Sequence, residues 1–402
     1  MKVVFVHPSY PNQFTEIAYG LARQAGWECS FLVDEGFTGQ IRGDNPPIAY
    51  YGYREEALPG SGLYYLQSME EGARRGKAVV EALAHIKAQR GVDAVVGHAS
   101  FGTTFFVREV LKIPVVSYIE LPGYYPLYCR PEFPGQYPQL LIDISFRALV
   151  YSSVLNSDLC LVPSQHAKNL LPKELQNKVR VQVEGFVLPA LQDKSCLRQS
   201  IGLDAAKPVI GFAARTLEAV RGFDIFVQAA GKIKQARKDV QFLVIGDEKT
   251  VYGNEMTYLG DKSFKEYALA AAGLCEQDFV FKPFMPYDRF VNHLQSMDIA
   301  MFPLFEGAAN WGLFEAMGAG LTILASNRCF VPEVIDHGRE GLLFDPGDVE
   351  GFSTAALAIL DDPESFENLG QNARGKIANR FSLEKAVTGY KKIICEAVGV
   401  NL

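Results

Sequence analysis

The chain has 402 residues, which at roughly 150 residues per domain is enough for two or three domains. Apolar residues make up 48% of it and charged residues 21%, which is typical of a globular protein with full hydrophobic cores. The formal net charge is -7, and this acidic balance disfavours nucleic acid and anionic lipid as partners.

Seven cysteines are scattered along the sequence, and none forms a C-x-x-C pair. An odd set without a pattern favours reduced thiols in a cytoplasmic protein over a disulfide framework. The opening apolar run, residues 3–6, is too short for a signal peptide, and no run approaches the ~18 apolar residues of a membrane-spanning helix. We therefore expect a cytoplasmic protein, with membrane contact that is at most peripheral and at the inner face.

Short apolar runs alternate with helical patterns through the first half of the chain. The first run, residues 3–6, is rich in β-branched and aromatic side chains and predicts a buried strand. The same pattern predicts further strands at residues 29–33, 94–96, 115–118 and 159–162. With helices between them, these runs have the βαβ rhythm of a doubly wound parallel sheet.

Residues 122–138 interrupt this rhythm with five prolines and several tyrosines. A long ordered loop near a ligand, a mobile flap and a plain surface excursion would each have such a composition. The sequence leaves these three interpretations open.

A second series of strands follows the polar stretch 190–207, at residues 208–212, 240–246, 299–303 and 321–325. We therefore predict an α/β protein with domains at 1–186 and 187–380, each a Rossmann-like doubly wound parallel sheet, that face each other across a cleft. Ligands of such sheets bind outside the carboxyl ends of the strands. In the C-terminal segment 381–402, residues 383–397 place apolar side chains on one face of a further helix.

The strongest chemical signal lies in residues 305–320, where a predicted strand enters a loop of small residues and then a short helix. Small residues let backbone N–H groups approach a ligand closely, and a helix N-terminus attracts an anion such as a diphosphate. Glu315, one turn inside this helix, would repel phosphate and is suited to accept hydrogen bonds from ribose hydroxyls. A solvated glutamate on an ordinary helix is the alternative.

Two arginines follow the first strand of the second series. Arg215 comes at the strand end, and Arg221 lies six residues on, just before a helix. Two guanidiniums at such a place can clamp a diphosphate and stabilise a leaving group that gains negative charge. A pair of surface arginines is the alternative.

Other segments narrow the chemistry. His98 ends a predicted strand and is a candidate for binding sugar hydroxyls or phosphate, with a structural histidine as the alternative. Residues 97–100 read G-x-x-S and miss the hydrolase pattern G-x-S-x-G. Residues 7–14 lack G-x-G-x-x-G, which disfavours a dinucleotide-binding oxidoreductase. Without D-x-D, H-E-x-x-H or a P-loop, we expect no cofactor and no metal held by one compact motif.

Together these segments resemble the retaining glycosyltransferases of family 4, which have the GT-B fold. Arg215 with Arg221-Gly222 is similar to that family's R-x5-K-G diphosphate clamp, with arginine in place of the usual lysine. Residues 313–320 are similar to its L-x-E-A-M-x-x-G helix, and residues 333–344 to its E-x-I…G-x-x-G-L-L segment. Residues 7–14 resemble a subgroup that begins H-Q-x-F-P-G-Q-F, and Asn12 replaces its glycine.

The resemblance implies hexosyl transfer, with retention, from a nucleoside-diphosphate sugar to a small-molecule, glycan or lipid-linked acceptor. The implied donor residues are Arg215, Arg221, Ala309, Asn310, Trp311, Gly312, Leu313 and Glu315. The implied acceptor-side residues are Asn12, Gln13, His98 and Glu120. It also implies that the helix at 383–397 crosses back onto the first domain.

One position departs from the family. Its two glutamates are usually spaced E-x7-E, which places the first at Gly307, and the nearest carboxylate is Glu306, one residue earlier. Either a shifted loop brings Glu306 to the donor sugar, or backbone groups take the role of the family's first glutamate. In the first case Glu306 joins His98, Arg215 and Arg221 as a candidate catalytic residue. Two rival functions follow, a sugar-nucleotide epimerase of the same fold and a non-catalytic nucleotide-sugar-binding partner subunit.

Overall fold

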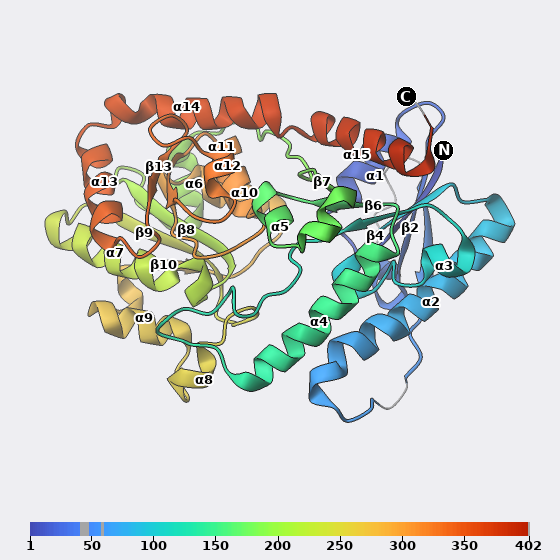
Figure 1. Cartoon of the computed structure of the whole chain (residues 1–402). Helices are drawn as coiled ribbons and strands as arrows, with labels where there is room; N and C mark the ends of the chain where they lie inside the picture. Colours follow the sequence, from blue (N-terminus) through green and yellow to red (C-terminus); the bar gives the residue numbers. More distant parts are fainter. Residues whose placement is uncertain (41–47, 58–59, 401–402) are drawn as a thin grey trace. The chain divides into compact units, whose positions relative to one another are not determined.

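The computed structural model describes residues 1–40, 48–57 and 60–400, which divide into two compact units. The first unit consists of residues 1–125, 136–185 and 383–402, and the second of residues 126–135 and 186–382. Each unit contains one parallel sheet, in the order β3-β2-β1-β4-β5-β6-β7 in the first and β10-β9-β8-β11-β12-β13 in the second. The predicted α/β fold with two Rossmann-like parallel sheets is confirmed (Figure 1).

The first sheet is buried on both faces. Its strands are β1 (Lys2–Val6), β2 (Glu28–Asp34), β3 (Ala49–Tyr53), β4 (Ala94–His98), β5 (Val115–Tyr118), β6 (Leu159–Val162) and β7 (Val179–Val181). Along β1, Val3 and Phe5 belong to one hydrophobic core, whereas Val4 and Val6 belong to the other. Because successive side chains of a strand point to opposite faces, a continuous apolar run is what a doubly covered strand requires.

Helices cover both faces of this sheet. They are α1 (Thr15–Ala22), α2 (Gln67–Arg90), α3 (Val107–Leu111), α4 (Tyr137–Leu155), α5 (Gln165–Asn169) and α15 (Leu383–Val398), with short 3-10 turns η1 (Glu35–Gln40), η2 (Tyr64–Leu66), η3 (Ala99–Phe101) and η4 (Lys173–Lys178). The core beside α1 includes Val387, Tyr390 and Ile394 of α15, which lies next to α1 in Figure 1. A Cβ at Gly20 of α1 would collide with Val387, so a glycine allows the two helices to approach closely.

The second sheet has the strands β8 (Val209–Thr216), β9 (Gln241–Asp247), β10 (Val280–Lys282), β11 (Ile299–Phe302), β12 (Thr322–Ser326) and β13 (Leu342–Phe344). Its helices are α6 (Lys194–Ile201), α7 (Phe223–Ala236), α8 (Met256–Leu259), α9 (Phe264–Ala272), α10 (Tyr287–Gln295), α11 (Trp311–Gly318), α12 (Val331–Val334), α13 (Val349–Asp361) and α14 (Pro363–Arg380), with the turns η5 (Ala219–Arg221) and η6 (Glu276–Asp278). The three-residue strands β7, β10 and β13 are absent from the predicted set, because runs this short carry too little periodicity to be recognised. The five-residue strand β3 is absent as well.

The Pro- and Tyr-rich segment corrects the predicted domain bounds. The predicted first domain runs through residues 1–186 without a break, whereas residues 126–135 belong to the second unit. The physical reason is Phe133, which is buried in the second unit's core and contacts the rings of Phe264 and Tyr267. We call residues 126–135 the excursion; in Figure 1 it runs beside α8 and α9. Of the three interpretations left open, the ordered loop fits this packing.

Within the residues that the structure describes, no helix has both the length and the apolar character needed to cross a membrane. All seven cysteines lie within it and are free thiols.

We predict that α15 stabilises the first unit specifically. Ile394 is fully buried, so Ile394→Ala should cost about 2–4 kcal/mol of that unit's unfolding free energy through lost burial and a cavity. The chain has two tryptophans, Trp27 in the first unit and Trp311 in the second, so single-tryptophan backgrounds report each unit separately in urea unfolding.

The expected result is a lower midpoint for the Trp27 transition with an unchanged Trp311 transition. The control is Lys385→Ala on the exposed face of α15, which should move neither transition. A shift confined to the Trp311 transition would show that the burial of Ile394 does not stabilise the first unit.

Candidate functional site

The candidate site of the second unit is built at the carboxyl ends of β8 and β11. These strands are parallel neighbours, so the loops that follow them begin at the same edge of the sheet. The amide of Phe305 donates a hydrogen bond of 2.9 Å to the carbonyl of Val220, which joins the two loops directly. Gly222 has φ of 73°, and a Cβ there would collide with the Pro303 carbonyl, so the close approach requires a glycine.

This junction places Arg221 against the loop that follows β11. A Cβ built on Gly307 would lie 3.7 Å from Nη1 of Arg221, and the Arg221 guanidinium carbon is 5.4 Å from the ring centroid of Tyr252. Arg215 lies near the end of β8 with an exposed side chain. Both predicted clamp residues therefore come from the same strand–turn segment, and the Arg221 guanidinium lies close to Gly307 of the second loop.

Helix α11 begins at the end of that loop. Asn310 is its N-cap, and its side-chain oxygen accepts a hydrogen bond of 3.0 Å from the Leu313 amide. The Leu313 side chain is fully buried. The amides of Trp311 and Gly312 belong to the first helical turn, whose N–H groups lack partners within a helix.

Glu315 is a buried carboxylic acid on α11. Its side chain is 6% exposed, and the hydroxyl of Tyr287 on α10 donates a hydrogen bond of 2.9 Å to Oε2. Burial raises the pKa of Glu315 to about 7, and the Tyr287 hydroxyl opposes this rise. Sequence reasoning missed Tyr287, because nothing in its local pattern indicates a partner 28 residues away.

Glu306 is buried in the same loop, and its Oε1 accepts a hydrogen bond of 2.8 Å from the Gly307 amide. Burial raises the pKa of the Cys329 thiol to about 12; the negative charge of Glu306 contributes to the rise, and the positive charge of Arg221 opposes it. Both side chains therefore lie within electrostatic reach of Cys329. Ala308 is buried and Ala309 is half-buried beside them.

A cavity of about 610 Å³ lies at the carboxyl ends of β9 and β10. Asp247, Glu248 and Lys249 give it polar walls, and Leu217, Phe281 and Pro283 give it apolar ones. Leu217 is also the residue that follows β8, so the cavity and the arginine-bearing turn adjoin.

In the first unit, His98 ends β4 and is 3% exposed. Its ring centroid lies 5.8 Å from that of His7, 5.1 Å from Tyr118 and 4.6 Å from Phe101. Burial lowers the pKa of His98 well below its ordinary value, with a smaller contribution from His7, and burial likewise lowers the pKa of His7 to about 4. Both rings are therefore neutral near pH 7. Sequence reasoning missed His7 as the neighbour of His98.

The other predicted acceptor-side residues follow strands at the same edge. Asn12 lies in the loop after β1, where its side chain accepts from the Phe14 amide at 2.9 Å and donates to the Ser9 carbonyl at 2.7 Å. Gln13 is half-buried next to it, and Glu120 follows β5 and is half-buried. Because β1, β4 and β5 are consecutive in the sheet, their carboxyl ends bring these residues to one side of the first unit.

Within the described ranges, no group of three or more His, Cys, Asp or Glu side chains has the geometry to hold a metal ion.

Two family models match consecutive parts of the chain. The model for the glycosyl transferase family 4 group matches residues 25–190, and the model for glycosyl transferases group 1 matches residues 193–376. The opening segment 7–14, which carried the resemblance to a subgroup, lies outside the first match.

Several curated relatives are named as transferases. The chain is 28% identical over 191 residues to 2-deoxystreptamine glucosyltransferase of Streptomyces kanamyceticus, a match that covers 47% of this chain and 46% of that protein. It is 24% identical over 388 residues to sulfoquinovosyl transferase SQD2 of Arabidopsis thaliana, covering 92% of this chain and 69% of that protein. The chain thus spans less than half the length of the first of these relatives.

Solved structures share the fold over the whole chain. Sucrose-phosphate synthase of Thermosynechococcus elongatus has a TM-score of 0.78 at 16% identity, with 99% of each chain covered. Anabaena HepE, solved in complex with UDP-glucose, has a TM-score of 0.71 at 17% identity, again with 99% of each chain covered. Residues 25–190 thus match the glycosyl transferase family 4 group, residues 193–376 match glycosyl transferases group 1, and the chain shares the fold of these solved structures, the GT-B fold.

Proposed function

We propose that this protein transfers a sugar from a nucleoside-diphosphate sugar to an acceptor hydroxyl. The observation that carries the proposal is the junction in the second unit, where Arg221, the Glu306–Gly307 loop and the start of α11 come together at one sheet edge. Positive charge and a helix N-terminus at the same place suit a diphosphate. HepE, which shares the fold, was solved with UDP-glucose.

The diphosphate would be held by Arg215 and Arg221, with amides between Ala309 and Gly312. When the bond to the sugar breaks, negative charge grows on the diphosphate, so fixed guanidiniums stabilise the transition state more than the bound donor. Leu313 stays among the proposed donor residues, although its amide already donates a hydrogen bond to the Asn310 side chain.

Glu315 would accept hydrogen bonds from the ribose, and Tyr287 would hold its carboxyl group in place. The base would enter the cavity beyond β9 and β10, which has the apolar walls that an aromatic ring favours and polar groups to select it. Glu306 would contact the donor sugar, because its carboxyl group lies in the loop next to Arg221.

The acceptor would bind at the carboxyl edge of the first unit, near Asn12, Gln13, His98 and Glu120. His98 is a neutral imidazole near pH 7, so we assign it hydrogen bonding to a hydroxyl and not the role of a cation. We further propose that the reaction transfers a hexosyl group with retention of anomeric configuration and without a D-x-D-bound metal. The proposed acceptor is a small molecule, a glycan or a lipid-linked sugar. We also propose that the chain belongs to the family 4 subgroup that residues 7–14 resemble.

The test is incubation of the pure protein with UDP-, GDP- and ADP-sugars, with and without an acceptor library. Release of nucleoside diphosphate that increases with an acceptor supports transfer. Conversion of the donor sugar without release indicates an epimerase, and binding without any turnover indicates a non-catalytic subunit.

The clamp makes the first prediction about this site. Arg215→Ala and Arg221→Ala should each weaken nucleoside-diphosphate binding roughly 10- to 100-fold, because a hydrogen bond to a charged group contributes ~1.5–3 kcal/mol. Titration calorimetry measures the affinity. Arg237→Ala, in the same unit at the far end of α7, is the matched control and should bind normally. Wild-type affinity for the nucleoside diphosphate in both clamp variants would show that Arg215 and Arg221 do not hold the diphosphate.

Metal removal gives a second prediction. Two guanidiniums supply the positive charge that a divalent cation would otherwise bring to the diphosphate, so turnover should survive dialysis against EDTA within about two-fold. Initial rates before and after dialysis measure this. Full loss, restored by Mn²⁺ or Mg²⁺, would contradict the proposed metal independence.

Glu315 gives a pH prediction. Its pKa of about 7 lies above the ordinary value of 4.5, so the folded state binds the proton more tightly than the unfolded chain. Stability is therefore lost as the pH rises from about 4.5 through 7, by up to about 3 kcal/mol at pH 8. Glu315→Gln, which mimics the protonated form, should abolish this loss.

The Trp311 transition in urea, recorded from pH 5 to 8 without ligand, measures the effect. Glu367→Gln, an exposed glutamate on α14, is the control and should leave the pH profile as in the wild type. A pH profile of Glu315→Gln that matches the wild type would show that this carboxyl group is ionised in the folded protein.

A further inference from the structure

Arg130, in the excursion, is a buried arginine inside the second unit. Its side chain is 5% exposed, and its Nη1 lies 2.7 Å from Oδ1 of Asp224, whose side chain is 7% exposed. The same nitrogen donates a hydrogen bond of 3.2 Å to the Ala219 carbonyl. The guanidinium carbon lies 4.1 Å from the ring centroid of Phe305. Burying such a pair costs solvation energy that packed apolar side chains would not cost, so stability alone is a weak reason for it.

The groups that Arg130 contacts are the supports of the candidate clamp. Ala219 begins the turn η5 that ends at Arg221, and Asp224 follows Gly222 in the first turn of α7. Phe305 precedes Glu306 in the second loop. One guanidinium therefore contacts both of the loops that meet at the diphosphate position.

The Ala219 peptide is held from two directions. Its amide donates a hydrogen bond of 3.0 Å to Oε1 of the buried Glu255, and its carbonyl accepts from Arg130. Oriented in this way, the backbone that leads to Arg221 has little freedom to rotate.

The rest of the excursion contacts the same region. The ring of Tyr128 packs edge-on against Tyr252 at 5.6 Å, and Tyr252 is the ring that lies beneath Arg221. The Pro134 carbonyl accepts hydrogen bonds from Nδ2 of Asn254, at 2.8 Å, and from the Tyr258 hydroxyl. The excursion therefore contacts the turn with Arg221 through Arg130 and the ring beneath Arg221 through Tyr128.

We propose that Arg130 is a positioning residue for diphosphate recognition, which fixes the turn 219–221 so that Arg221 is presented to the diphosphate. The inference rests on the proposed function. Arg130 need not contact the ligand, because its effect passes through the Ala219 carbonyl and Phe305 to Arg221.

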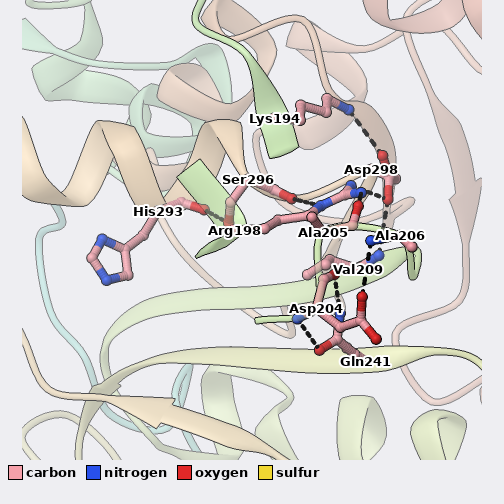
Figure 2. A network of polar contacts seen from close by, with 10 residues as sticks. All are labelled: Lys194, Arg198, Asp204, Ala205, Ala206, Val209, Gln241, His293, Ser296 and Asp298. Carbon is pink, nitrogen blue, oxygen red and sulfur yellow. Dashed lines mark hydrogen bonds and ion pairs between the residues drawn. The ribbon is translucent and has the colours of Figure 1, made fainter. Parts of the chain in front are cut away.

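A comparison pair at the amino ends of the strands of the same sheet, buried Arg198 with the partly exposed Asp298, separates positioning from simple stabilisation. Arg198, 9% exposed, donates from Nη2 to Oδ2 of Asp298 at 2.5 Å and from Nε to the Ser296 carbonyl at 3.0 Å (Figure 2). Asp298 also accepts from the Val209 amide at 2.8 Å, at the amino end of β8. Arg198 thus has a partner set like that of Arg130 but lies at the edge where ligands of parallel sheets do not bind.

The experiment compares Arg130→Met with Arg198→Met in the full chain. Affinities for UDP, GDP and ADP are measured by calorimetry, and those for uridine, guanosine and adenosine by ligand-observed NMR. Arg130→Met should weaken the best-bound diphosphate about ten-fold, which corresponds to about 1.4 kcal/mol, and leave its nucleoside unchanged. Arg198→Met should lower the melting temperature without changing either affinity.

Arg130→Lys tests the geometry of the side chain separately from its charge. If Arg130→Met does not fold, Arg130→Lys replaces it in the comparison with Arg198→Met. A lysine keeps the ion pair with Asp224, but its single ammonium cannot reproduce both the planar contact with the Phe305 ring and the Nε contact with Glu132. We expect a melting temperature close to that of the wild type together with a loss of diphosphate affinity. Wild-type diphosphate affinity in Arg130→Lys and Arg130→Met would overturn the inference.

A double-mutant cycle with Arg221→Ala completes the test. If Arg130 acts through Arg221, Arg130→Met should add less than two-fold to the loss already caused by Arg221→Ala. Losses that multiply would mean that Arg130 does not act through Arg221. If the wild-type chain binds none of the three diphosphates, the proposed function fails and this inference fails with it; if the wild type binds and only the Arg130 prediction fails, the proposed function stands.

Discussion

The close backbone approach between Gly222 and Pro303 is the constraint on which the second unit's candidate site depends. Residue 222 has a left-handed conformation, and any side chain there would collide with the Pro303 carbonyl. The approach allows the Phe305 amide to pair with the Val220 carbonyl, so two loops that follow different strands become one surface. A larger residue at 222 would separate Arg221 from the loop that contains Glu306, even with every other side chain unchanged.

Buried charge is concentrated around this junction. Glu218, Asp224 and Glu255 are each at most 5% exposed, and Arg130 is the buried cation among them. Glu218 accepts from the Tyr252 amide at 3.0 Å, so the carboxylates hold backbone amides and not only cations. Burial raises the pKa values of Asp224 and Glu255, which shows that the fold maintains these carboxyl groups at a cost. Such a cost is common where a backbone must be held in one orientation for binding.

Much of the fold could be predicted from the sequence, because its signals are local. The apolar run at residues 3–6 and the strand at 159–162 correspond to β1 and β6, whose two buried faces require continuous apolar residues. The strands β7, β10 and β13 have three residues each and gave no signal of their own. The excursion was recognised as unusual from its prolines, but its place depends on Phe133 and Arg130 meeting residues about 90 to 130 positions away, which no periodicity reveals.

The candidate site shows the same division. Arg215, Arg221, Glu315 and His98 could be selected because each lies at a strand end or a helix start that the sequence makes visible. Their partners could not be selected: Tyr287 for Glu315, Tyr252 for Arg221 and His7 for His98 come from other elements and meet them only in three dimensions. Leu313 stays a predicted donor residue, and the structure adds that its amide donates a hydrogen bond to the Asn310 side chain, which the motif alone does not indicate.

The placement of α15 has a consequence for synthesis on the ribosome. The first unit begins at residue 1, yet one side of its core is formed by Val387, Tyr390 and Ile394. The ribosome must add residues 186–382, roughly 200 residues, before this helix emerges, which takes about 10–40 s at ~5–20 residues per second. During that interval the apolar surface around α1 has no cover, while the second unit is still being made. The unit whose first residues are made before those of the other is therefore the one whose core is completed after it.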